Sequence, residues 1–298
     1  MRHFIDTKEL DAQTVDTLFK LADSLAGKRN DSLKGKILAT LFYEPSTRTR
    51  LSFESAMFRL GGDVLSSENA SDNSSAFKGE TLEDTLRMIS GYADIAVVRH
   101  SEAGSVGRAV RVSNIPIVNA GDGGNEHPTQ ALIDAYTIRK ELGTIGGKQV
   151  VIVGDAKHSR AIRSFAEILA LFPDVTITFV SPQGLEIGDD VKSYLSSRSV
   201  SYSETDDLSG SISQADVLYT NRIQKERFAE GSAQTLEKSF VVTRSLAENL
   251  RKGSIIMNPL PRIDELETDV DSLESAAYFR QAENGVSVRM ALISFLLK

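Results

Sequence analysis

The chain has 298 residues and a formal net charge of −7, with 41% hydrophobic and 25% charged residues. This composition is that of an ordinary globular protein, and the length suffices for one large domain or for two smaller ones, each with its own core. The absence of cysteine excludes disulfides, thiolate metal ligands and cysteine nucleophiles, and the acidic balance argues against a general nucleic-acid-binding surface.

The first residues lack the apolar core of a signal peptide, and no run approaches the roughly 18 to 20 apolar residues that span a bilayer. The lack of cysteine also fits a reducing compartment. We therefore expect a cytoplasmic protein that contacts neither membrane nor nucleic acid. Any anion that it binds must be held by a local cluster of cations, since the chain as a whole is acidic.

Strand-like and helical segments alternate through the first half of the chain. Apolar residues at helical spacing predict a helix over 8–26, and the continuous apolar run 35–43 predicts a strand buried on both faces. The next helix ends at Gly61-Gly62, and the polar stretch 66–77 has no periodicity and is predicted to be a loop. The remaining elements of this half are a helix at 79–92, strands at 93–100 and 115–121, and a helix that begins near His127.

The same alternation starts again near Gly143. We predict a helix over 160–171 and strands at 146–155, 175–182, 215–221, 239–243 and 253–260. The final stretch, 286–297, predicts a helix too short to cross a membrane. Strands that alternate with helices of about 10 to 15 residues indicate parallel sheets, so the sequence predicts two α/β domains.

Ligands of open α/β sheets bind where strands end and loops lead into helices, and four such places here are rich in polar residues. The first is STRTR, Ser46–Arg50, which stands where a strand becomes a helix. Helix N-terminal amides, hydroxyls and the guanidinium groups of Arg48 and Arg50 suit a phosphate group. An N-cap serine followed by solvated arginines would give the same local sequence.

The second place is the start of the helix at His127, where Pro128 suits the first turn and Gln130 follows. An imidazole there can donate a hydrogen bond to a carbonyl oxygen, although a lone histidine in a loop is more often a capping residue. Third, Arg160 begins a helix after a glycine pattern too incomplete for a dinucleotide fingerprint. Fourth, a basic run over 222–227 follows a strand, and such a run is usually a solvated face.

Two further features lie outside these four places. Lys78 ends the predicted polar loop, which would let it swing into a site, and the stiff segment NPLPR, 258–262, follows a strand. The chain has no nucleophile elbow, no Walker A loop and no HExxH pair. The candidates are cationic or neutral donors, so they suit holding an anion and polarising its carbonyl or phosphoryl group rather than covalent catalysis.

Four motifs in this order and spacing closely resemble the catalytic chains of aspartate carbamoyltransferases: STRTR at 46–50, HPTQ at 127–130, RIQKER at 222–227 and PLPR at 259–262. The resemblance covers essentially the whole chain. STRTR with an HPxQ element alone would indicate only the wider carbamoyltransferase family, which includes ornithine carbamoyltransferase. The resemblance implies two doubly wound domains with the active site in the cleft between them, a carbamoyl phosphate-binding domain at 1–142 and an aspartate-binding domain at 143–277. It further implies that a C-terminal helix at 278–298 packs back on the first domain.

The resemblance also implies a role for each matching residue. The phosphate would be held by Ser46, Thr47, Arg48, Thr49 and Arg99, and the carbamoyl carbonyl would be polarised by His127 and Thr49 with Arg48 or Arg99 nearby. The carbamoyl NH₂ would be positioned by Gln130 and the backbone carbonyls of Pro259 and Leu260. The two carboxylates of L-aspartate would be bound by Arg160, Arg222 and Gln224. Ser74 and Lys78 would reach into the site of a neighbouring subunit, and Glu44 would pair with Arg160 and Arg227 on domain closure.

By the same resemblance the working unit is a homotrimer with shared active sites, to which regulatory chains are a conceivable addition, and neither metal nor organic cofactor is expected. The cationic second-domain set favours aspartate as acceptor over ornithine. Asn258 stands where some aspartate enzymes have histidine. Two alternatives to an aspartate enzyme remain, a transferase for another amino-acid acceptor such as ornithine and a non-catalytic protein that binds phosphorylated metabolites.

Overall fold

The computed structural model describes residues 2–73, 75–223 and 238–298, which form two compact units. Unit 1 comprises the chain up to Ile133 together with Glu283–Lys298, and unit 2 is Asp134–Ala282. Two helices belong partly to each unit: α6, Pro128–Leu142, and α12, Tyr278–Leu296. Among the described residues no helix combines the length and the apolarity that a membrane span requires.

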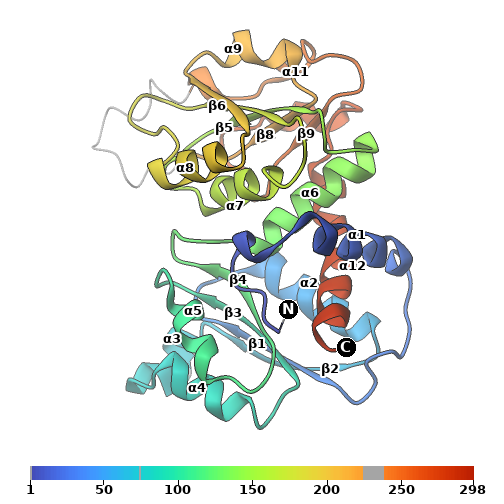
Figure 1. The fold of residues 1–298 in the computed structure, drawn as a ribbon, viewed down its shortest axis with the longest axis vertical. Helices are drawn as coiled ribbons and strands as arrows, with labels where there is room; N and C mark the ends of the chain where they lie inside the picture. Colours follow the sequence, from blue (N-terminus) through green and yellow to red (C-terminus); the bar gives the residue numbers. More distant parts are fainter. Residues whose placement is uncertain (1, 74, 224–237) are drawn as a thin grey trace. The chain divides into compact units, whose positions relative to one another are not determined.

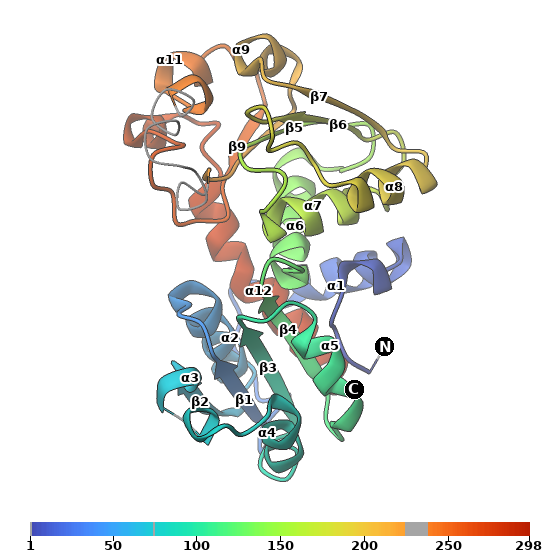
Figure 2. The same cartoon turned by 90° about the vertical axis from the view of Figure 1, so that its left-hand side faces the viewer.

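Unit 1 is built on a four-stranded, fully parallel sheet with the strand order β2-β1-β3-β4 (Figures 1 and 2). Its strands are β1 Ile37–Phe42, β2 Asp63–Glu68, β3 Ile95–His100 and β4 Ile117–Asp122. Its helices are α1 Ala12–Leu25, α2 Thr47–Arg59, α3 Ala70–Asn73, α4 Leu82–Ile89 and α5 Ser105–Ala109, with 3-10 turns η1 Thr7–Glu9, η2 Ser75–Lys78 and η3 Val110–Val112.

Helices cover both faces of this sheet, as expected for buried parallel strands. One face packs against α4 and α5 through a cluster that includes Ala39, Leu41 and Val98 from the strands and Leu86 and Val106 from the helices. The opposite face carries α2. The C-terminal helix α12 also packs within unit 1, because the guanidinium carbon of Arg289 lies 4.8 Å from the centre of the Phe53 ring of α2.

Unit 2 is built on a five-stranded parallel sheet with the order β7-β6-β5-β8-β9. Its strands are β5 Gln149–Val153, β6 Thr176–Val180, β7 Ser201–Thr205, β8 Val217–Thr220 and β9 Ile255–Met257. Its helices are α7 Arg160–Leu169, α8 Asp189–Ser197, α9 Leu208–Ser211 and α11 Arg244–Ala247, with 3-10 turns η4 Ile212–Gln214, η6 Lys238–Phe240 and η7 Thr268–Ser272. Phe165 of α7 stacks on Tyr219 of β8 with ring centres 4.4 Å apart, which anchors that helix to the sheet.

The predicted class, two α/β domains with parallel sheets and a C-terminal helix, is confirmed, but two local predictions are wrong and some elements were not predicted. The stretch 66–77 is not a loop: it contains the end of β2, helix α3 and η2. Strands β2 and β7 and helix α8 are among the elements that were not predicted. The apolar run 239–243 forms no extended strand, because only Val242 makes an isolated parallel bridge, to Leu266.

Candidate functional site

The strand order of unit 1 places its switch point between β1 and β3. The chain goes from β1 outward to β2, and then crosses to β3 and β4 on the other side. Phe42 at the end of β1 is in register with Arg99 of β3, and the Tyr43 amide donates to the Arg99 carbonyl at 2.9 Å. The loop before α2 and the side chain of Arg99 therefore lie at the position where open α/β sheets bind ligands.

The N-terminus of α2 lies at this switch point and has free capacity to bind an anion. Ser46 occupies the N-cap position but makes no side-chain capping bond; its hydroxyl accepts instead from Arg99 Nη1 at 3.4 Å. The first-turn amides of a helix have no intrahelical acceptor, and they carry the positive end of the helix dipole. Thr49 is buried, Thr47 and Arg48 are exposed, and desolvation lowers the pKa of the Arg48 guanidinium, which nevertheless stays charged at neutral pH.

Glu44 lies beside the N-terminal turn of α2. Its Oε2 accepts from Arg99 Nε at 3.2 Å, and both side chains are partly exposed. A single guanidinium thus links Glu44 to Ser46 within unit 1. The pairing of Glu44 with Arg160 and Arg227 stays a prediction, and Arg227 lies outside the described residues.

The side chain of Arg50 does not lie on the same side of α2 as that of Arg48. This differs from the sequence hypothesis that both guanidinium groups bind a phosphate group. Arg50 Nη2 donates to Glu68 Oε2 at 2.7 Å, and its Nη1 lies 3.2 Å from Glu54 Oε1 and 3.3 Å from Ser66 Oγ. Residues two positions apart on a helix differ by about 200° around its axis, so the side chains of Arg48 and Arg50 point to opposite sides of α2. The second arginine of STRTR therefore contacts β2.

His127 and Gln130 lie at the start of α6, which follows β4, the neighbour of β3. His127 is 8% exposed, and its carbonyl accepts from the Gln130 amide at 3.0 Å. Buried Asp122 holds the loop before it by accepting from the Gly104 amide at 2.8 Å, from Asn119 Nδ2 at 2.9 Å and from the Glu126 amide at 3.2 Å. Sequence analysis missed Asp122, although an aspartate between glycines after a strand is a signal for such a loop.

Unit 2 has its own switch point, between β5 and β8. Gly154 directly follows β5 and has φ 135°, and a Cβ on it would lie 2.1 Å from the Asn221 carbonyl oxygen, so only glycine fits. The loops after β5 and β8 therefore touch, and they carry Arg160 and Arg222. Arg160 is the first residue of α7, whose N-cap Ser159 accepts from the Ile162 amide at 3.3 Å.

Both arginines are partly exposed, so two cations follow neighbouring strands of unit 2. Gln224, the third residue expected to bind aspartate, lies outside the described residues. Asp155, which sequence analysis missed, shapes the loop before Arg160: it is fully buried and accepts from the His158 amide at 3.0 Å.

Pro259 and Leu260 follow β9, the neighbour of β8, and Asn258 fixes their backbone. The Asn258 side chain is 2% exposed; its Nδ2 donates to Thr220 Oγ1 and to Glu265 Oε1, each at 2.9 Å. Its Oδ1 accepts from the Leu260 amide at 2.7 Å. Leu260 has φ 55°, a conformation that non-glycine residues adopt rarely and that is enriched at functional sites.

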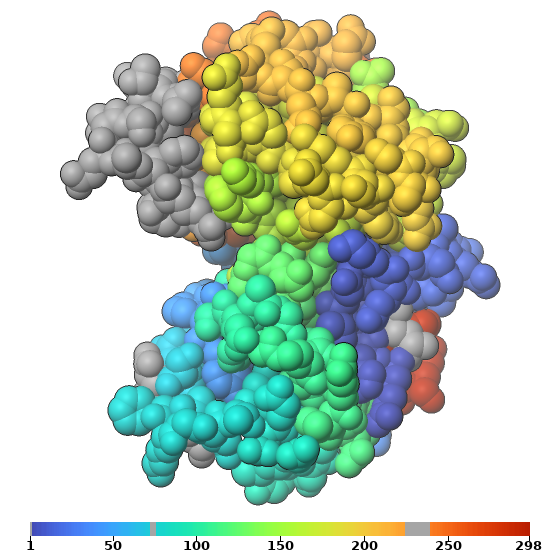
Figure 3. All heavy atoms as spheres, turned by 60° about the vertical axis from the view of Figure 1, so that its left-hand side comes forward, coloured from blue at the N-terminus to red at the C-terminus, as the bar shows by residue number. Residues whose placement is uncertain are grey.

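Lys78 ends η2 and is exposed, next to Phe77, whose side chain is 75% exposed. Figure 3 shows this part of the chain, in cyan, on the surface of unit 1. Ser74, the other residue predicted to serve a neighbouring subunit, lies outside the described residues. The resemblance assigned both to another subunit, and the structure of one chain leaves that assignment a prediction.

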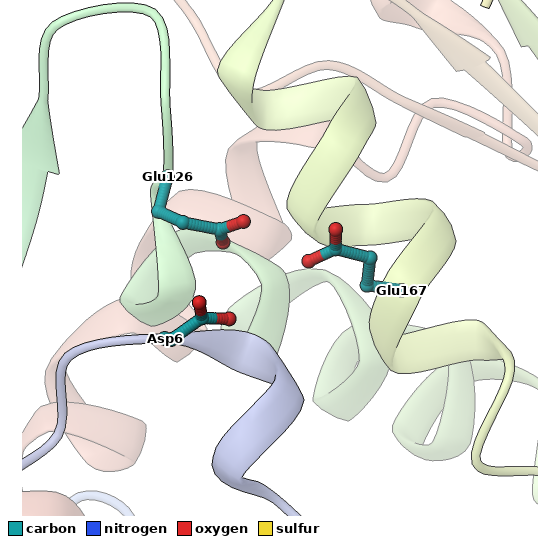
Figure 4. A group of neighbouring side chains, drawn as sticks. All are labelled: Asp6, Glu126 and Glu167. Carbon is teal, nitrogen blue, oxygen red and sulfur yellow. The ribbon is translucent and has the colours of Figure 1, made fainter. Parts of the chain in front are cut away.

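Two carboxyl groups of unit 1 approach each other outside the predicted site. Oxygens of Asp6 and Glu126 lie within 4.8 Å of one another (Figure 4). Thr7 Oγ1 donates to Glu126 Oε2 at 3.1 Å, Lys8 Nζ lies 4.0 Å from Glu126 Oε1, and the Lys8 amide donates to Asp6 at 2.8 Å. Thr7 and the Lys8 amide each donate to one oxygen of the pair, and acidic groups commonly lie together without an ion, so we assign no metal to it.

A cavity of about 230 Å³ opens in unit 2 at the carboxyl ends of β6 and β7. It is lined by Phe179, Ser181, Gln183, Glu186, Glu204, Thr205 and Asp206. None of the predicted site residues lines it, and its acidic side chains do not suit an anionic substrate.

Taken unit by unit, the arrangement suits two anionic substrates. Unit 1 offers helix amides, hydroxyls and two arginines for a phosphate group, together with the imidazole of His127, which stands between β4 and α6. Unit 2 offers two arginines for carboxylates and a rigid backbone turn whose carbonyl oxygens can accept hydrogen bonds from an amide. No described residue at either place has the arrangement of a nucleophile paired with a base.

Comparison with known proteins matches both halves of the chain to one family. Residues 2–140 match the model described as the carbamoyl-P binding domain of aspartate/ornithine carbamoyltransferase, and residues 146–296 match its Asp/Orn binding domain. The chain is 49% identical over 300 residues to a protein of Pisum sativum named aspartate carbamoyltransferase 1, chloroplastic, an alignment that covers 98% of this chain and 78% of the relative.

Two solved structures are similar in fold as well as in sequence. The catalytic subunit of M. jannaschii aspartate transcarbamoylase has a TM-score of 0.92 at 44% identity, with 99% of this chain and 98% of that chain covered. The aspartate transcarbamoylase of Trypanosoma cruzi in complex with carbamoyl phosphate and aspartate has a TM-score of 0.91 at 34% identity, with 98% and 94% covered.

Proposed function

Because the chain belongs to the aspartate/ornithine carbamoyltransferase family, we propose that it is an aspartate carbamoyltransferase, which makes N-carbamoyl-L-aspartate and phosphate from carbamoyl phosphate and L-aspartate. One observation carries the choice of aspartate: the loops after β5 and β8, at the switch point of unit 2, carry two arginines, Arg160 and Arg222, and two cations suit a dicarboxylate. The product is an early intermediate of pyrimidine biosynthesis.

Carbamoyl phosphate binds through its phosphate group to the N-terminus of α2. The amides of the first turn, the hydroxyls of Ser46, Thr47 and Thr49, and the guanidinium groups of Arg48 and Arg99 supply the donors. This proposal is supported by the hydrogen bond between Arg99 and Ser46 and by the missing side-chain cap of α2. Cations and helix amides favour a dianion and stabilise the charge that the phosphate gains as it leaves.

The carbamoyl carbonyl is polarised by His127 and Thr49, while Gln130 and the carbonyls of Pro259 and Leu260 position its NH₂ group. The α-amino group of aspartate attacks the carbonyl carbon, the bond from that carbon to the phosphate oxygen breaks, and the departing phosphate takes the proton that the amine loses. Orientation of two bound reactants lowers the barrier without a dedicated base. The residues of this chain need neither a metal nor an organic cofactor for these steps.

L-Aspartate binds through its two carboxylates to Arg160, Arg222 and Gln224. Planar guanidinium groups bind carboxylates in a bidentate manner, and two of them suit a dicarboxylate better than a chain that ends in an ammonium group. The functional domains are residues 1–142 for carbamoyl phosphate and 143–277 for aspartate, with 278–298 returning to the first domain. Arg289 on Phe53 supports that return.

The active unit is a homotrimer in which Ser74 and Lys78 of one subunit serve the site of its neighbour. The exposure of Lys78 and Phe77 on the surface of unit 1 supports this arrangement. A relative in M. jannaschii is named a catalytic subunit, which makes regulatory chains a reasonable additional partner. We place the enzyme in the cytoplasm; the pea relative is named chloroplastic, so cell fractionation tests this point.

The test is carbamoyl transfer by the purified chain with L-aspartate and L-ornithine as parallel acceptors. We expect carbamoyl-aspartate and phosphate in equal amounts, with no product from ornithine. Product from ornithine alone would refute the reading of the two arginines and leave that of α2 intact. No transfer to either acceptor, despite binding of carbamoyl phosphate, would refute the proposed activity.

A further inference from the structure

The first turn of α2, which holds the phosphate in the proposed function, has little local support. Its N-cap Ser46 makes no capping hydrogen bond, and its first intrahelical bond, from the Arg50 amide to the Ser46 carbonyl, is 3.4 Å long. An N-cap side chain typically stabilises a helix start by about 1 kcal/mol. The position of this turn must therefore be fixed by contacts to the rest of unit 1.

Such contacts run from Arg50 to the edge strand β2. The Arg50 side chain is 18% exposed and lies between Glu54, one turn further along α2, and Glu68, the last residue of β2. Its two terminal nitrogens donate to different carboxylates, at 3.2 Å to Glu54 and at 2.7 Å to Glu68. Charge-assisted hydrogen bonds of this kind are stronger than neutral ones, and the planar guanidinium fixes their directions.

The same contacts extend into the sheet. Glu54 Oε1 also accepts from Ser66 Oγ of β2 at 2.6 Å and from Thr40 Oγ1 of β1 at 3.1 Å. Thr40 and Ser66 are partners in the β1–β2 register, and Thr40 is fully buried. Arg50 and Glu54 thus attach the first two turns of α2 to both strands beneath them.

We propose that Arg50 is a positioning residue: clamped between Glu54 and Glu68, it holds the first turn of α2 in the geometry that binds phosphate, without touching the phosphate itself. The inference rests on the proposed function for its substrate. It assigns the two arginines of STRTR different tasks, with Arg48 as the ligand and Arg50 as the residue that orients it.

Substitution of Glu68 distinguishes a positioning role of Arg50 from a purely electrostatic effect, because the two hypotheses predict opposite changes in the affinity for carbamoyl phosphate. Removing a carboxylate near an anion site should strengthen anion binding on electrostatic grounds alone, and should also release Arg50 to help bind the phosphate. If Glu68 instead clamps Arg50, Glu68→Gln weakens binding of carbamoyl phosphate. We expect a rise in its dissociation constant of roughly tenfold, since small misplacements of binding groups are costly.

The matched control is Asp63→Asn at the start of β2, an exposed residue that removes the same charge from the same strand. Dissociation constants are measured by calorimetry with carbamoyl phosphate on the purified wild-type protein and on each variant. Asp63→Asn should leave the constant within about twofold. In an Arg50→Ala background Glu68→Gln should have little further effect, because the two residues act as one unit.

A second readout does not depend on the ligand. Hydrogen exchange of the amides in residues 46–53 should be faster in Glu68→Gln than in Asp63→Asn, because the turn loses its attachment. Unchanged exchange, or tighter binding of carbamoyl phosphate by Glu68→Gln, would overturn the clamp. If the wild-type protein does not bind carbamoyl phosphate, the proposed function fails, and the exchange measurement still decides whether Arg50 positions α2.

Discussion

The side chain of Asn258 supports the turn that carries Pro259 and Leu260. It is 2% exposed and makes three hydrogen bonds, to Thr220, to Glu265 and from the Leu260 amide. Neutral hydrogen bonds contribute about 1 kcal/mol each and one to a carboxylate about 1.5–3 kcal/mol, so Asn258→Ala should cost about 3.5–5 kcal/mol of unfolding free energy.

Urea unfolding of the purified protein, followed by circular dichroism, measures this loss. The matched control is Asn249→Ala: Asn249 is exposed and its side chain makes one bond, to the Ser245 carbonyl at 3.1 Å. Its removal should cost less than about 0.5 kcal/mol. A loss below about 1 kcal/mol for Asn258→Ala would refute the reasoning, because it would mean that the buried amide is not needed to hold the turn.

The same variant should also impair catalysis at a defined step. Freed from Asn258 Oδ1, the Leu260 amide no longer fixes the carbonyl oxygens that the proposed mechanism uses to orient the carbamoyl NH₂ group. We therefore expect kcat to fall while the dissociation constant of carbamoyl phosphate, which is set in unit 1, changes little. Equal losses in both quantities would indicate general misfolding.

Three further outcomes are expected. Arg222→Ala should raise the KM for aspartate by about two orders of magnitude and leave carbamoyl phosphate binding within about twofold, measured by steady-state kinetics and calorimetry. Assemblies of Lys78→Ala and of Arg222→Ala, each with little activity at an aspartate concentration near the wild-type KM, should regain activity at that concentration when dissociated and mixed, whereas no recovery in reassembled hybrids would contradict shared sites. Burial lowers the pKa of His100, and its Nδ1 accepts from the Glu102 amide at 3.0 Å, so the folded state resists protonation. Its contribution to stability is therefore complete above the unfolded pKa of about 6.5 and falls as pH drops from there, and His100→Gln should show a smaller loss of urea stability between about pH 7 and pH 5.

The elements predicted correctly are those with a continuous apolar run or clear helical spacing. Strands β1, β3 and β5 are buried on both faces, so nearly every residue is apolar. Strands β2 and β7 lie at sheet edges and are largely exposed, so their sequences are polar and carry no hydrophobic signal. The opposite error was the strand predicted at 239–243. It arose because an apolar run can be buried by side-chain packing without pairing to another strand.

These errors explain which parts of the site the sequence could not reveal. The place of Arg48 follows from local features alone, a strand, a serine and a helix start. The partner of Arg50 lies on β2, so a reading in which 66–77 is a loop leaves that arginine free for the phosphate. In the same way the role of Asn258 depends on Glu265 and Thr220, which come from separate segments and meet it only in the folded unit.

Glu44 has an observed partner in unit 1 and two proposed partners in unit 2. The two pairings predict opposite effects of a Glu44 substitution on the affinity for carbamoyl phosphate. In unit 1 it accepts from Arg99 Nε at 3.2 Å and so competes with the phosphate for that guanidinium. On the proposed domain closure it pairs with Arg160 and Arg227 instead, which releases Arg99 to the substrate. Glu44→Gln should therefore bind carbamoyl phosphate as well as the wild type or up to about threefold more tightly.

The same change should lower kcat and abolish the compaction expected when a bisubstrate analogue binds, which is measured by small-angle scattering of the protein in solution. Gln keeps the size of the side chain and removes only its charge, so a steric explanation is excluded. Weaker carbamoyl phosphate binding with normal compaction would contradict the closure role and would assign Glu44 to the orientation of Arg99. Lost compaction and normal compaction therefore separate the two roles. A carboxylate that only orients Arg99 would leave the other domain, and hence the compaction, unaffected.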